Sequence, residues 1–161
     1  MQPRFSVIVF CEAGAGGNPP TRDIIESSIK QFEGVTLAER WLAGAVPPTL
    51  PEGWRAVAEH EATAREALRH AMQKLALVDG FFLAPFDAPS VERGILDAMI
   101  ARYLDVRRKL GRIVVIERDG RQGWPWLVDI GFRQPFIELA DGQPLEAVLA
   151  ANAAQVHSVK G

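Results

Sequence analysis

The sequence predicts a single α/β domain with a doubly wound, five-stranded parallel sheet and helices on both faces. Short, nearly continuous apolar runs, typical of strands buried on both faces, alternate along the chain with longer amphipathic segments. Glycine and proline interrupt the pattern between these segments. Such an alternation is typical of parallel strands that are joined by helices through right-handed crossovers.

The first half of the chain is expected to contain two strands and two helices. Phe5–Cys11 is an almost unbroken run of β-branched and aromatic residues and predicts the first strand. A helix is expected at Thr21–Phe32, because isoleucines recur there at helical spacing. Val35–Ala38 predicts a short second strand. Arg55–Leu77 is the longest helical pattern, and its many alanines suit close packing on a sheet.

A strand, a sharp turn and a long helix follow. Gly80–Ala84 is a short apolar run that ends at Pro85, and Ser90–Leu110 has apolar residues at helical spacing. The next apolar run, Arg112–Glu117, predicts a further buried strand.

The remaining elements are shorter. Trp124–Phe132 is expected to be a short helix opened by Pro125. The fifth strand is expected at Phe136–Leu139 and a closing helix at Pro144–Ala154. Residues 156–161 are expected to form a frayed tail outside the domain, which covers residues 1–155.

The composition excludes several classes of protein. Apolar residues make up 48% of the 161 residues and charged residues 24%, as in ordinary globular domains. The net charge of -2 gives no basic surface for nucleic acid and no polybasic membrane patch. The single cysteine, Cys11, excludes an internal disulfide and fits a reducing compartment. Because the sequence has neither a signal-peptide layout nor a membrane-length apolar run, we expect a cytoplasmic protein.

The most informative stretch for function is Val78–Arg93, in which a strand, a loop and a helix start follow one another. This arrangement builds ligand pockets at the carboxyl ends of strands in open α/β sheets. Glu92 stands at the helix start, where an ionised carboxylate could act in glycosidic chemistry or could simply stabilise the helix. Asp87 could be a pocket carboxylate or a turn residue between two prolines, and the second interpretation is favoured.

Three other features could carry function. The loop Glu12–Pro20 is rich in glycine and could cradle a phosphate, or it could be a surface loop. The irregular segment Glu39–Gly53 contains Trp41, which could contact a ligand or, as we favour, anchor the packing. His60 and His70 lie ten residues apart, too far for a helical metal-binding pair. We therefore assign no metal and no cofactor.

The order of several motifs resembles the nucleoside 2-deoxyribosyltransferase-like family, which includes nucleotide N-glycosidases. The matching segments are Asp79–Pro85, Glu92-Arg93-Gly94, Ile113–Asp119, Trp126–Gly131 and Phe136–Leu139. Departures from the family pattern occur at Pro89, where a glycine is usual, and at Ala71, where an aspartate is usual.

This resemblance implies a flavodoxin-like, Rossmann-like fold and a homodimer. It implies cleavage or transfer of an N-glycosidic bond in a small-molecule nucleoside or nucleotide, with Glu92 as nucleophile. The implied substrate-binding residues are Gly14, Gly16, Gly17, Trp41, Phe86, Asp87 and Ser90. Of these, Ser90 would offer its hydroxyl to a phosphate, and Phe86 and Trp41 would stack on the base.

Three alternatives remain open. Val9-Phe10-Cys11 with Ala15-Gly16 and Asn18-Pro19 resembles the LOG-type phosphoribohydrolases. Asp79–Pro85 with Gly94-Ile95-Leu96 resembles flavodoxin-like flavin reductases, which implies an oxidoreductase that binds flavin or nucleotide. A non-catalytic ligand-binding domain on the same fold is the third alternative.

Overall fold

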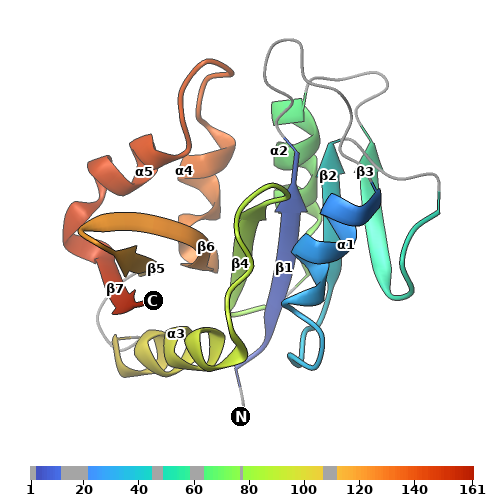
Figure 1. The fold of residues 1–161 in the computed structure, drawn as a ribbon. Coiled ribbons are helices and arrows are strands. Elements are labelled where there is room, and N and C mark those ends of the chain that lie inside the picture. Colours follow the sequence, from blue (N-terminus) through green and yellow to red (C-terminus); the bar gives the residue numbers. More distant parts are fainter. Residues whose placement is uncertain (1–2, 12–21, 45–48, 59–63, 77, 107–111) are drawn as a thin grey trace.

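A computed structural model describes residues 3–11, 22–44, 49–58, 64–76, 78–106 and 112–161 (Figure 1). The strands are β1 Phe5–Phe10, β2 Arg40–Gly44, β3 Trp54–Ala58, β4 Gly80–Pro85, β5 Ile113–Arg118, β6 Arg121–Asp129 and β7 Val156–Lys160. The α-helices are α1 Arg22–Lys30, α2 Ala64–Lys74, α3 Arg93–Val106, α4 Arg133–Ile137 and α5 Glu146–Ala151. Two 3₁₀ turns, Ile130–Phe132 and Ala153–Gln155, complete the described elements.

The seven described strands form one sheet in the order β3-β2-β1-β4-β6-β5-β7. All neighbours are parallel except β6, which runs antiparallel to both β4 and β5. The predicted α/β class with a doubly wound, Rossmann-like sheet is therefore confirmed. The sheet has two strands more than the five we expected, and it is not wholly parallel.

The hydrophobic core has two layers, one on each face of the sheet. In β1, Ile8 and Phe10 face the layer that α2, α4 and α5 cover, whereas Val7 and Val9 face the layer that α1 and α3 cover. All six residues of β1 are buried. The alternation of side chains along a strand explains why its residues are apolar, except for the buried Ser6, when both faces are covered.

The β6 strand corrects the expected helix Trp124–Phe132. Pro125 lacks a backbone N–H, but here it lies where the register between β5 and β6 shifts, so the missing donor is tolerated. The apolar run Trp126–Val128 is fully buried between β4 and β5. Burial in the centre of the sheet therefore outweighs the local preference of proline for a helix start.

The β2 and β3 strands lie elsewhere than predicted. Val35–Ala38 is not a strand, and the second strand begins at Arg40. The predicted helix Arg55–Leu77 is too long at its start, because Trp54–Ala58 pairs with β2 as an edge strand. Alanine favours helices, but pairing and packing of this segment decide its structure.

Three further predictions from the sequence differ from the structure. The long helix begins at Arg93, not at Ser90. Phe136–Leu139 is not a strand, since Arg133–Ile137 forms α4. The expected tail forms β7, which pairs with β5 from Ile113 onward.

None of the helices in the described residues has the length and apolarity to cross a membrane.

Candidate functional site

The candidate site lies at the carboxyl ends of β1 and β4, the central pair of parallel strands. From β1 the chain continues to β2 on one side, whereas β4 lies on the other side, so the strand order reverses here. Such a switch point leaves a crevice outside the strand ends, where open α/β sheets bind ligands. The N–H of Phe86 donates to the carbonyl oxygen of Phe10 over 2.8 Å and joins the two strand ends.

Asp87 follows directly and is exposed at this junction. It lines a pocket of about 250 Å³ on the α1 side, together with Asp23, Ser27 and Ser28. It also lines a pocket of about 230 Å³ on the β6 and α5 side. Within the described residues, no hydrogen bond or ion pair engages its carboxylate. A free carboxylate thus separates two hollows at the switch point.

The loop that carries Asp87 is fastened to α1. Ser90 Oγ donates to the carbonyl oxygen of Ser27 over 2.9 Å, and the N–H of Val91 donates to Gln31 Oε1 over 3.2 Å. Gln31 in turn donates to the carbonyl oxygen of Ser28 over 2.9 Å. Ser90 is therefore a tether of the loop in this structure, and these bonds fix the backbone on which Asp87 stands.

The pocket on the β6 and α5 side, which we name the aromatic pocket, is lined by eight residues. They are Phe10, Pro85, Phe86, Asp87, Trp124, Pro144, Leu145 and Glu146. Trp124 is half-buried and stacks on the buried Trp126 with a centroid distance of 3.7 Å and an interplanar angle of 15°. Phe10 meets Trp124 edge to face at 5.7 Å. These contacts hold one wall of the aromatic pocket in place.

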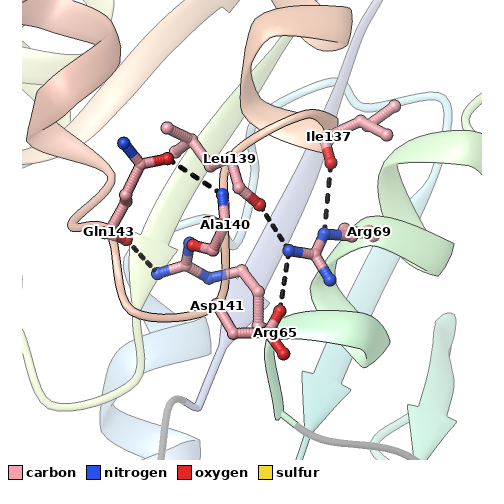
Figure 2. Close-up of polar contacts among 7 residues, drawn as sticks. All are labelled: Arg65, Arg69, Ile137, Leu139, Ala140, Asp141 and Gln143. Carbon is pink, nitrogen blue, oxygen red and sulfur yellow. Dashed lines mark hydrogen bonds and ion pairs between the residues drawn. The ribbon is translucent and has the colours of Figure 1, made fainter.

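The opposite wall is the start of α5, and Arg65 of α2 holds the loop that leads to it (Figure 2). Its guanidinium donates to the carbonyl oxygens of Ala140, over 3.2 Å, and of Gln143, over 2.8 Å. The side chain of Gln143 also accepts from the N–H of Ala140 over 2.9 Å. Because Arg65 is only 6% exposed, these bonds form largely away from water.

Arg69, one helical turn further along α2, holds the same loop at a second place (Figure 2). It donates to the carbonyl oxygens of Ile137, over 3.1 Å, and of Leu139. It also forms an ion pair of 2.8 Å with Asp141. Together the two arginines fix the chain between α4 and α5 just before the wall of the aromatic pocket.

The predicted site residues have different positions. Phe86 and Asp87 lie together at the switch point, whereas Gly14, Gly16 and Gly17 lie outside the described residues. Trp41 is 6% exposed in β2 and donates to Glu39 Oε2 over 2.8 Å, as expected of a packing anchor. Glu92 is exposed just before α3, and its carbonyl oxygen accepts from the N–H of Ile95 over 3.0 Å. It does not line either pocket beside Asp87.

Sequence reasoning missed Trp124, Glu146 and the two arginines. Trp124 was hidden by the wrong assignment of β6 as a helix. Arg65 and Arg69 occur at helical spacing on α2, but nothing in the sequence says that their partners are main-chain carbonyls far along the chain. Among the described residues, no group of three or more His, Cys, Asp or Glu residues could hold a metal ion by itself.

Comparison with known proteins gives no match to a family model and none to a curated protein sequence. Solved structures are similar over the whole chain. Rv0371c from Mycobacterium tuberculosis, in a complex with manganese, has a TM-score of 0.73 and 16% identity over 100% of this chain and 89% of that one. The 2-C-methyl-D-erythritol 4-phosphate cytidylyltransferase of Francisella tularensis has a TM-score of 0.69 and 11% identity over 98% and 90% of the two chains.

A third similar structure is CMP:2-keto-3-deoxy-manno-octonic acid synthetase complexed with CTP. It has a TM-score of 0.65 and 11% identity over 98% of this chain and 90% of that one. The resemblances to the nucleoside 2-deoxyribosyltransferase-like family and to the LOG-type phosphoribohydrolases are therefore wrong. The motif order that carried them reflects a strand, loop and helix start that different α/β proteins share. At these identities the likeness concerns the fold alone.

Proposed function

We propose that this chain binds a nucleoside triphosphate beside Asp87 and transfers its nucleotidyl group to an acceptor. The similarity to solved cytidylyltransferases supports this function, and one of them is described as complexed with CTP. N-glycosidic bond cleavage, expected from the sequence, and the flavin-dependent or non-catalytic alternatives have no counterpart among these proteins. The proposal replaces them.

The observation that carries the proposal is the free carboxylate of Asp87 between two hollows at the switch point. A nucleotidyl transfer brings two substrates together at one phosphorus atom. A donor on one side of Asp87 and an acceptor on the other would meet next to its carboxylate. The α1 side suits the donor, because the chain between β1 and α1 is the glycine-rich segment and leads to a helix start.

A divalent cation fits the residues present. Mg²⁺ is usually bound through one or two carboxylates together with substrate phosphates, and a single exposed Asp87 offers that donor set. A similar protein has been solved in a complex with manganese. When bound, the cation would neutralise charge on the phosphates. Asp87 would hold it, and the tethers of the loop through Ser90 and Val91 would orient Asp87.

The pocket on the α1 side is acidic, so a bound cation should favour triphosphate binding there. Asp23 and Asp87 both line this pocket, and none of its described lining residues is Lys or Arg. The two carboxylates of this pocket would repel an uncomplexed triphosphate, so its binding should strengthen with Mg²⁺ or Mn²⁺.

Isothermal titration calorimetry with CTP, UTP, GTP and ATP, each with and without MnCl₂, tests the proposal. We expect at least one nucleotide to bind in the presence of Mn²⁺ and none in the presence of EDTA. Asp87→Asn should abolish this binding. Glu52→Gln removes an equal charge from an exposed position before β3, an edge strand that β2 separates from β1, and should bind like the wild type. Absence of binding by all four nucleotides with Mn²⁺ would refute the proposal.

A further inference from the structure

We propose that the aromatic pocket binds the acceptor, and that this acceptor is an aromatic amine with a hydroxyl group. The role of this ligand as an acceptor rests on the proposed nucleotidyl transfer. The ligand class follows from the pocket itself.

The walls of the aromatic pocket favour a flat apolar group. Phe10, Phe86 and Trp124 contribute rings, and Pro85, Pro144 and Leu145 contribute further apolar surface. Trp124 is held by its stack on Trp126, so its ring is ordered before any ligand binds. A rigid aromatic wall binds another ring, or a cation over the ring face, at a low cost in conformational entropy.

The charges of the aromatic pocket select a cation. Its charged lining residues are Asp87 and Glu146, and none of its eight described lining residues is Lys or Arg. Glu146 is exposed at the start of α5, and within the described residues no hydrogen bond or ion pair engages its carboxylate. An acceptor with a phosphate or carboxylate at this place would meet like charge, whereas an ammonium group could pair with Glu146 and lie over the ring of Trp124.

The position of Asp87 explains the hydroxyl group. Asp87 belongs to both pockets, so an acceptor in the aromatic pocket can reach the donor bound on the α1 side. In the transfer the acceptor oxygen forms a bond to the α-phosphorus, the bond from that phosphorus to the β-phosphate oxygen breaks, pyrophosphate leaves, and the hydroxyl proton passes to solvent. A neutral hydroxyl approaches this acidic edge without charge repulsion.

The pocket is also built to keep its shape. Arg65 and Arg69 fix the loop that ends at Pro144, and the stack with Trp126 fixes the other wall. Such preorganisation reduces the loss of side-chain conformational entropy on binding. The selectivity for a cationic ring should therefore be measurable with small probes and without a nucleotide.

Three probes with the same phenol ring test the proposal by calorimetry: tyramine, para-hydroxybenzyl alcohol and para-hydroxyphenylacetate. They are cationic, neutral and anionic. We expect tyramine to bind about fivefold more tightly than the alcohol, and the acetate to bind most weakly. Glu146→Gln should remove most of the preference for tyramine over the alcohol, whereas Glu52→Gln should preserve it.

Trp124→Leu should weaken tyramine binding about tenfold, and Phe86→Ala, at a half-buried position, provides a second test should the tryptophan variant be unstable. Equal or tighter binding of para-hydroxyphenylacetate would overturn the proposal, as would tyramine binding that neither Glu146→Gln nor the aromatic variants change. Because these titrations contain no nucleotide, their outcome is independent of whether CTP binds. The proposed transfer fails separately if no nucleotide binds with Mn²⁺.

Discussion

The N–H of Phe86 donates to the carbonyl oxygen of Phe10 and so joins the end of β4 to the end of β1. This bond places the next residue, Asp87, directly above the seam between the two strands. Glu92, five residues later, is exposed before α3 and lines neither pocket there. The two carboxylates should therefore behave differently when each is neutralised.

Glu92→Gln is expected to leave Mn²⁺-dependent nucleotide binding unchanged. Its side chain adds charge near the start of α3, so the free energy of unfolding should change by less than about 1 kcal/mol. Calorimetry with CTP and urea denaturation check both statements, with Asp87→Asn measured beside it. If Glu92→Gln abolished nucleotide binding and Asp87→Asn did not, the site would lie at the start of α3.

Arg69→Ala should destabilise the protein by about 2–3 kcal/mol, because the loop loses two hydrogen bonds from a charged donor and the ion pair with Asp141. Arg69→Lys keeps the charge but cannot reach two carbonyl oxygens at once, so we expect an intermediate loss. Urea denaturation measures both.

The matched control for Arg69 is Arg102→Ala. Arg102 forms an exposed ion pair of 3.5 Å with Asp105 on α3, and such pairs contribute little to the stability of the folded protein. Its loss should change stability by less than about 0.5 kcal/mol. Equal changes in the free energy of unfolding for Arg69→Ala and Arg102→Ala would show that Arg69 does not stabilise the loop between α4 and α5.

Tyr103→Phe removes a buried hydroxyl that lies 2.6 Å from Asp129 Oδ1 and 2.9 Å from the carbonyl oxygen of Asp79. The ring stays in the core between α3 and the sheet, so the variant should fold. We expect a loss of about 1–2 kcal/mol, since the single hydroxyl proton shared by these two acceptors is lost at a part-buried site. A thermal melt that matches the wild type would mean that water replaces the hydroxyl without cost.

Leu83→Ala should cost about 3–5 kcal/mol, because Leu83 is fully buried in β4 and its loss leaves a cavity under α2 and α4. The control is Ile24→Ala on α1, where the side chain is 42% exposed, and a change below about 1 kcal/mol is expected. Urea denaturation of both variants compares them. Similar losses at the two positions would contradict the assignment of β4 to the centre of the core.

The sequence predicted the α/β class and three central strands because apolar runs buried on both faces leave an unmistakable pattern. The predicted secondary structure was wrong where the local preference of a segment differs from the structure that its tertiary contacts impose. Pro125 favours a helix start, yet it lies in a register shift between two buried strands. Trp54–Ala58 is alanine-rich, yet it pairs as an edge strand. In both cases the deciding partner lies far away in the sequence.

The candidate site was predictable only in part. The loop after β4 was identified as the functional stretch, and Phe86 and Asp87 lie at the strand ends as the topology requires. The sequence favoured Glu92 as the catalytic residue and a turn role for Asp87, although both are carboxylates near a helix start. Only the geometry places Asp87 between two pockets. Trp124 and Glu146 come from elements some 40 to 60 residues later in the chain, which spacing alone could not bring together.

The arginine contacts of α2 have a consequence for how this protein can change. Arg65 and Arg69 donate to four main-chain carbonyl oxygens of this loop, and Arg69 also pairs with the side chain of Asp141. The restraint thus depends on the path of the loop and hardly on which residues compose it. Substitutions at the exposed Glu138 and Ala140, whose side chains make none of these bonds, can accumulate without loosening the loop before α5. Evolution or a protein engineer could therefore alter ligand preference beside this loop while the fold stays intact.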